Sequence, residues 1–233
     1  MKYKQIYIAI LLCYCKYIIF YNLITMIIKK TNLNKLSNFG KDNSYLSIVE
    51  RKKPRNSDLF FKDLLVQPIS ISVIISKNSA FRDIKKILDK TLSLDLKNNL
   101  FYNYWIKDMS NITGVFSDTI QEQKICFNLE TLRGCKRYHI DNVPMRLLVT
   151  YYGKGTEWLH PDACNYLAYN NGEKNNKIIK KNAEKKYLNN WDIAIFKGKK
   201  YSSEGKGILH RTPDAALGKP SLLMRLDSHE YLT

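Results

Sequence analysis

The fold is decided by the stretch from Arg137 to Tyr152, which reads RYHIDNVPMRLLVTYY. Its second half, Arg146 to Tyr152, is a short apolar run with β-branched and aromatic residues, which predicts a strand. Comparable runs flank it in the chain: ICFNLETL from Ile125, WDIAIF from Trp191, ILH from Ile208 and SLLMRL from Ser221. Short strands separated by turn residues, with few helices between them, are typical of a sandwich or a barrel.

The region before these strands has a mostly helical pattern. Ile69 to Ile75 reads ISISVII and predicts a strand, whereas Ser79 to about Leu92 and about Asp108 to Gln123 carry apolar residues at helical spacing. The expected fold class is therefore α+β. We expect a helical part over residues 59–123, packed on a double-stranded β-helix (jelly-roll or cupin-like) barrel over residues 124–233, the two together forming a single domain.

The amino-acid composition of the N-terminal residues differs from that of the rest of the chain. Residues 31–58 are polar and rich in Lys, Asn and Ser, which predicts a linker. Within residues 1–30, the run from Ile6 to Ile28 is apolar and about as long as one membrane span, but Lys16 lies near its centre, where a charge is unfavourable. Two interpretations stay open: an anchor that tethers a cytoplasmic protein to the inner membrane, or a start site assigned too early, with Met26 as the true first residue.

The composition narrows the classes of partner and compartment. The net charge of +17 comes mostly from Lys, together with many Asn, Ile and Tyr residues, as in proteins from AT-rich genomes. Readers of nucleic acid usually use clustered Arg and aromatic side chains, so we do not expect a nucleic-acid partner. The five cysteines are irregularly spaced and predict reduced thiols. The charge-dense stretch from Gly172 to Lys186 predicts a solvated loop or an exposed helix.

Three residues predict a metal site. His139 and Asp141 lie two positions apart, and in an extended chain such side chains point to the same side. His210 follows the run GKGIL much later in the chain. Two histidines and one carboxylate that leave other coordination positions open form the arrangement of non-haem iron(II) oxygenases. Iron(II) is thus the expected metal, with zinc as the alternative.

The C-terminal stretch supplies candidate residues for a co-substrate. The order of motifs resembles that of the jelly-roll oxygenases, in which a cation followed two residues later by a hydroxyl commonly binds the far carboxylate of 2-oxoglutarate. Lys219 and Ser221 occupy that place in GKPS, and Arg225 shares their strand face by parity. Arg146 and Thr150 also share a face and are expected to line the cavity.

Other residues have weaker signals. In an extended chain Cys135 would lie about 13 Å from His139, too far to share an ion. Glu157 is a spare carboxylate whose orientation is not clear from the pattern. Trp158 is expected in the core or pocket wall, and His160 and His229 on the surface.

From about Leu64 to its end the chain resembles the bacterial family called "domain of unknown function 1826" (DUF1826). The densest match runs from Cys135 to Leu159, and it continues in DIAIFKG from Asp192, in GILHRTP from Gly207 and in LLMRLD near the end. Lys154 stands where the family pattern suggests proline. The family has no established activity, so the resemblance implies kinship and no reaction.

These observations give three hypotheses. The first is an iron(II)- and 2-oxoglutarate-dependent oxygenase that acts on an unknown small-molecule or protein substrate. The second is a non-catalytic cupin-like protein that binds a metal such as zinc or iron. The third is an interaction protein that contacts the membrane through residues 6–28. A cation that binds a carboxylate inside the barrel would distinguish the first hypothesis from the second.

Overall fold

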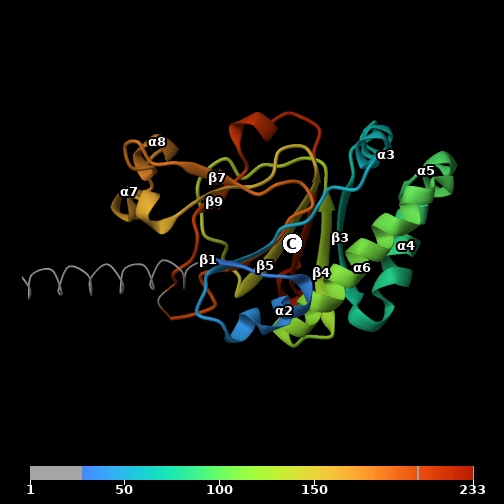
Figure 1. Cartoon of the computed structure of the whole chain (residues 1–233), viewed down its shortest axis with the longest axis horizontal. Helices are drawn as coiled ribbons and strands as arrows, with labels where there is room; N and C mark the ends of the chain where they lie inside the picture. Colours follow the sequence, from blue (N-terminus) through green and yellow to red (C-terminus); the bar gives the residue numbers. More distant parts are fainter. Residues whose placement is uncertain (1–27, 204, 233) are drawn as a thin grey trace, which may run out of the picture.

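The computed structural model describes residues 28–203 and 205–232, shown in colour in Figure 1. The apolar segment expected over residues 6–28 lies outside them, apart from Ile28, so the anchor and the early-start interpretations both concern residues that are not described. None of the helices within the described ranges is long and apolar enough to cross a membrane.

The strands form two sheets. The large sheet has the order β1-β2-β8-β5-β10-β4-β3, and the small sheet has the order β7-β6-β9. All pairs are antiparallel except β1 with β2. The bounds are β1 Ile28–Lys30, β2 Leu46–Val49, β3 Ser70–Ser76, β4 Lys124–Glu130, β5 Met145–Tyr152, β6 Glu157–Leu159, β7 Lys185–Tyr187, β8 Ile193–Lys197, β9 His210–Arg211 and β10 Leu222–Ser228.

Helices surround this pair of sheets, which confirms a mixed α+β fold. The α-helices are α2 Leu33–Leu36, α3 Ser57–Leu64, α4 Ala80–Thr91, α5 Leu94–Asn98, α6 Leu100–Ile120, α7 Tyr166–Asn170 and α8 Asn175–Ile178. The 3-10 helices are η1 Ser37–Lys41, η2 Lys77–Ser79, η3 Pro161–Ala163, η4 Asp214–Ala216 and η5 His229–Tyr231. Figure 1 shows α4 and α6 beside β3 and β4, and α7 and α8 beyond β7 and β9.

The alternation of side chains along β5 and β10 explains how the large sheet has an apolar face toward the helices and a polar face toward the small sheet. On one face Leu147 and Val149 of β5 and Met224 of β10 belong to the hydrophobic cluster that includes α3, α4 and α6. On the other face the same strands present Arg146 and Arg225 toward the small sheet. Because successive side chains of a strand point to opposite faces, one apolar-polar pattern builds both the core and the site.

Helix α6 begins earlier than the sequence predicts. The predicted helix starts at about Asp108, whereas α6 starts at Leu100, where the Asn99 side chain accepts a hydrogen bond of 2.9 Å from the Phe101 N–H. This cap and the buried Trp105 extend the helix by two turns toward its N-terminus.

The structure corrects the linker predicted over residues 31–58. This segment contains α2, η1 and β2, and β2 lies inside the large sheet, paired with β8. Leu36, Phe39 and Leu46 are buried. The reason is that each apolar cluster here is very short, so the abundant Lys, Asn and Ser hide it from a composition argument.

The predicted barrel over residues 124–233 is also revised. Three strands of the large sheet, β1 to β3, come from residues before 124, and the described strands belong to two separately hydrogen-bonded sheets instead of one closed barrel. The stretch from Gly172 to Lys186, predicted as a solvated loop or an exposed helix, is mostly exposed and contains the short helix α8, whose Ile178 is fully buried.

Candidate metal centre

The backbone brings the two predicted histidines together. His139 and His210 exchange a pair of hydrogen bonds, from His139 N–H to His210 O (3.0 Å) and from His210 N–H to His139 O (3.1 Å). Directly opposed residues on neighbouring strands place their side chains on the same side, and the two ring centroids are 4.6 Å apart. Asp141, two residues after His139, completes a cluster whose ligand atoms all lie within 4.8 Å of one another.

Both imidazoles are oriented by the backbone. Nδ1 of His139 lies 3.0 Å from the carbonyl oxygen of Arg137, and Nδ1 of His210 lies 3.0 Å from that of Ile208. A neutral imidazole that donates its Nδ1–H to such a carbonyl has a lone pair on Nε2. The two Nε2 atoms lie 3.5 Å and 3.1 Å from the Asp141 carboxylate, so all three potential ligands face one point.

The Asp141 carboxylate has an atom that a metal would satisfy. Its Oδ2 is buried and accepts no hydrogen bond from any described residue, although Nε2 of His210 lies only 3.1 Å away. A buried polar atom without a hydrogen bond is unfavourable. A cation held by the two nitrogens and this oxygen removes that penalty, so the residues fit a divalent metal, and the donor set suits iron(II) or zinc.

Electrostatics keep Asp141 ready to bind a cation. Burial opposes ionisation of this carboxyl, but attraction to His210, His139 and Arg146 outweighs it and holds the pKa of Asp141 well below its usual range. Burial lowers the pKa of His139, but the Asp141 carboxylate raises it by more than burial lowers it. The pKa of His139 therefore lies above its ordinary value. A metal therefore meets an ionised carboxylate and competes with a proton at His139.

Arg146 fixes the carboxylate ligand from behind. Its Nε and Nη2 contact the two carboxylate oxygens of Asp227 at 2.7 Å and 3.0 Å, and its Nη1 donates to Oδ1 of Asp141. Asp227 is completely buried, and burial raises its pKa despite the arginine. Arg146 thus lines the cavity, as strand parity predicts, and it orients a ligand residue.

The three residues lie in a narrow pocket of about 70 Å³, whose wall also includes Arg133, Cys135 and Arg225. Arg225 Nε lies 3.4 Å from Asp227, and its Nη2 lies 3.8 Å from Glu130. Cys135 lines the pocket but does not belong to the ligand cluster.

Arg133 is held differently from the other pocket arginines. It donates to the Lys154 carbonyl (2.6 Å) and to the Thr156 hydroxyl (2.9 Å). Burial lowers its pKa to about 10. Arg133 lies in an irregular stretch before His139, where no periodicity could have predicted its position.

Lys219 and Ser221 lie elsewhere, so the prediction that they share a strand face with Arg225 is wrong. Both residues precede β10, which starts at Leu222, so the alternation on which the prediction relied does not extend to them. The Ser221 hydroxyl donates to the Thr131 carbonyl (3.3 Å), and Lys219 lines a different cavity.

The remaining candidates are also placed. Glu157 is no spare ligand, because Arg211 contacts both its oxygens at 2.8 Å and 3.2 Å, and the Tyr138 hydroxyl donates to it. His160 caps η3, and His229 contacts Glu122 (2.9 Å). Asp227 was missed, although its parity with Arg225 in LLMRLD was a usable signal.

A family model described as a protein of unknown function, DUF1826, matches residues 30–227. The search of curated proteins finds no match.

Solved structures give several distant likenesses. A dioxygenase for auxin oxidation from rice has a TM-score of 0.45 and 10% identity, covering 86% of this chain and 82% of that one. The 2-oxoglutarate complex of dioxygenase for auxin oxidation 1 from Arabidopsis thaliana has a TM-score of 0.41 and 10% identity, covering 87% and 92%. An oxidoreductase of the 2OG-Fe(II) oxygenase family from Burkholderia pseudomallei has a TM-score of 0.37 and 7% identity, covering 87% and 94%. Since these scores are low, we derive the chemistry from the residues of this chain.

Proposed function

The chain belongs to the DUF1826 family of proteins of unknown function, and from its site we propose that it is an oxygenase dependent on iron(II) and 2-oxoglutarate. The observation that carries the proposal is the convergence of His139, Asp141 and His210, with both Nε2 atoms turned toward one carboxylate. Two imidazoles and one carboxylate leave the other positions of an octahedral ion open for a co-substrate and dioxygen.

The strand order supports a jelly-roll scaffold for this site. Successive segments of the chain mostly alternate between the two sheets. Their order is β4, His139, β5 and β6, followed by β7, β8, β9 and β10. Such alternation between two facing antiparallel sheets is what a double-stranded β-helix requires. The three candidate ligands lie between the two sheets. His210 belongs to the small sheet, and Asp141 accepts a hydrogen bond from Arg146, which belongs to the large sheet.

Each neighbouring residue has a role in holding the ligands. A bound iron(II) ion supplies the capacity to activate dioxygen. Arg146 takes Oδ1 of Asp141 and so leaves Oδ2 for the ion. Asp227 grips Arg146, and the ring of Phe196 packs on His210 with 4.5 Å between centroids. Such supporting contacts fix the orientation of ligands and tune their basicity.

Arg225 is our choice for the anchor of the 2-oxoglutarate far carboxylate. It lines the same pocket as the ligands and extends from the same sheet face as Arg146. A guanidinium can bind a carboxylate through two parallel hydrogen bonds. Its position favours it over Lys219 and Ser221, which lie outside this pocket.

A second candidate function is a non-catalytic metal-binding protein, and the size of the pocket favours it. A volume of about 70 Å³ accommodates an ion with a few water molecules. A five-carbon diacid fits only if pocket side chains move. The same three ligands with a water molecule would also satisfy tetrahedral zinc.

The two functions are separated by 2-oxoglutarate turnover after anaerobic loading with iron(II). Once dioxygen and a reductant such as ascorbate are added, an oxygenase should convert 2-oxoglutarate to succinate and CO2 even without its substrate. Arg225→Met should weaken 2-oxoglutarate binding roughly 10- to 150-fold through loss of a charge-assisted contact. Lys219→Met is the matched control and should leave binding unchanged. If the iron-loaded protein binds no 2-oxoglutarate, the oxygenase proposal fails and the metal-binding function replaces it.

A further inference from the structure

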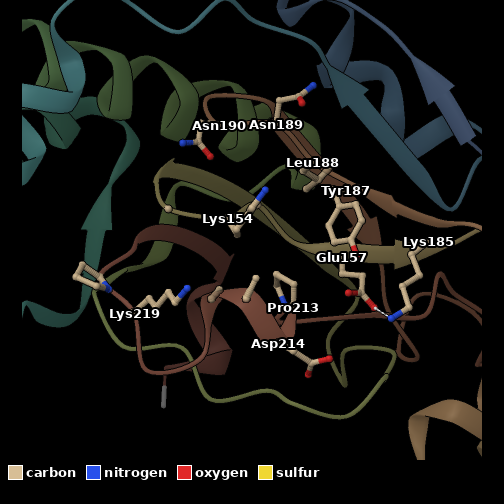
Figure 2. A pocket seen from close by; sticks show the side chains of 15 residues that line it. Lys154, Glu157, Lys185, Tyr187, Leu188, Asn189, Asn190, Pro213, Asp214 and Lys219 are labelled. Carbon is tan, nitrogen blue, oxygen red and sulfur yellow. Dashed lines mark ion pairs between the residues drawn. The ribbon is translucent and has the colours of Figure 1, made fainter.

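A second and larger cavity lies beside the metal pocket. Its volume is about 930 Å³, and Lys154, Lys185 and Lys219 line it together with Tyr187, Asn189 and Asn190 (Figure 2). It is built by the turn at residues 153–155, the loop at residues 188–190 and the loop at residues 213–220. Nothing in the proposed oxygenase function uses these residues.

Gly153 and Gly155 allow the three loops to approach one another closely on either side of Lys154. A Cβ on Gly153, whose φ is +89°, would lie 2.8 Å from the Ser221 Cβ, and a Cβ on Gly155 would lie 1.9 Å from the Leu188 carbonyl oxygen. Only glycine allows so close an approach of backbone. The turn therefore contacts both other loops directly, and Lys154 is held between them.

The loop that carries Asn189 and Asn190 stores backbone strain. Trp191 has a φ of 74°, which is rare for a bulky side chain. The conformation is held by hydrogen bonds from Trp191 N–H to the Thr150 carbonyl (2.9 Å), from Arg51 Nε to the Trp191 carbonyl (2.7 Å) and from Asn189 N–H to Asp192 Oδ2 (2.9 Å). Strain of this kind concentrates at functional sites.

The charges of the cavity do not cancel. Its two acidic residues, Glu157 and Asp214, are both bound by the guanidinium of Arg211, at 2.8 Å and 2.6 Å. Lys185 lies 3.9 Å from Glu157. Neither Lys154 nor Lys219 pairs with an acidic residue of the described part of the chain, and both line the cavity; Figure 2 shows the Lys154 amino group directed toward Leu188 and Tyr187. The cavity therefore has a net positive charge.

We propose that this cavity binds a phosphorylated small molecule, with its phosphate between Lys154 and Lys219. Lysine ammonium groups bind phosphate as point charges. The amides of Asn189 and Asn190 both donate and accept hydrogen bonds, and together with the Tyr187 hydroxyl they suit the hydroxyl groups of such a ligand. The volume lies within the usual range of small-molecule sites, about 300–1,000 Å³.

The test is titration calorimetry of the full chain with inorganic pyrophosphate at constant ionic strength. Lys154→Met/Lys219→Met should weaken binding roughly 10- to 100-fold, because two charge-assisted contacts are lost. Lys35→Met/Lys86→Met removes the same charge from exposed positions on α2 and α4 and should leave binding nearly unchanged. Both pairs are solvent-exposed, so their unfolding curves should match that of the wild type.

Three results would overturn the proposal. One is no saturable binding of pyrophosphate to the wild-type chain. Another is equal weakening in the two double variants, which would indicate a diffuse effect of net charge. The third is loss of binding in Arg225→Met, which removes a cation of the metal pocket, with retention in Lys154→Met/Lys219→Met; this would place the anion in the metal pocket. Since no arm requires a bound metal, failure here is distinguishable from failure of the oxygenase proposal.

Discussion

Replacing Arg146 by Met tests whether one guanidinium organises the metal pocket. Arg146 contacts Asp141 and Asp227, whose exposed fractions are 3% and 0%. Methionine keeps a long apolar stem but removes the charge and the donors. Both carboxylates then lose a principal cationic partner within a buried environment.

The expected loss of stability is about 3 kcal/mol at pH 7.5. Removing one partner of a buried ion pair costs about 3–5 kcal/mol, and the lower end applies because Asp141 keeps two histidines and Arg225 still lies 3.4 Å from Asp227. Burial already raises the pKa of Asp227, and loss of Arg146 raises it further. A carboxyl whose pKa is higher in the folded than in the unfolded protein does not lower the free energy of unfolding below its unfolded pKa near 4, and it lowers that free energy as the pH rises above this value. The stability lost on replacing Arg146 should therefore be larger at pH 7.5 than at pH 5.

Urea unfolding of the metal-free protein at both pH values measures this effect. The double variant Arg146→Met/Asp227→Asn should recover part of the loss, on the order of 1–2 kcal/mol, because it removes one buried charge. A loss below about 1 kcal/mol at pH 7.5, or one that does not change with pH, would refute the assigned role of Arg146.

Three further predictions concern packing, proton competition and thiol reactivity. In urea unfolding, Gly155→Ala should destabilise the fold by about 3 kcal/mol or more, because the new Cβ would lie 1.9 Å from a backbone oxygen; Gly114→Ala in α6, with nothing within 4 Å, should stabilise it by about 0.5–1 kcal/mol. Because the pKa of His139 is raised, metal affinity measured by competition with a chelator should fall about tenfold per pH unit below that pKa; an affinity independent of pH would contradict the role of this histidine. Burial raises the pKa of the Cys164 thiol to about 11, so iodoacetamide at pH 8 should label the exposed Cys135 first, and peptide mass mapping that shows equal labelling would contradict the structure.

The parts of the site that the sequence predicts are those that follow from local backbone geometry. His139 and Asp141 share a side because side chains alternate in an extended chain, and Arg146 faces the cavity for the same reason. His210 could be assigned only because it ends a strand-like run. Its backbone pairing with His139 is a long-range contact that no local pattern contains.

The parts that could not be predicted depend on irregular backbone or on weak local signals. Lys219 and Ser221 lie before the start of β10 at Leu222, so strand alternation does not place them on the face of Arg225, and the run SLLMRL does not mark that start. The strand β2 has only four residues inside a Lys- and Asn-rich segment, so tertiary packing against β8 decides its structure. Arg133 reaches the pocket from an irregular stretch without periodicity.

The central claim is that His139, Asp141 and His210 hold one metal ion, and anaerobic equilibrium dialysis against iron(II) tests it most directly. We expect one ion per wild-type chain. Asp141→Asn and His210→Gln should each weaken binding at least tenfold, because each removes one of three ligands, while His229→Gln, which changes a histidine outside the cluster, should bind as the wild type does. A wild-type chain that retains no iron, or substitutions at Asp141 and His210 that leave binding unchanged, would contradict the metal site.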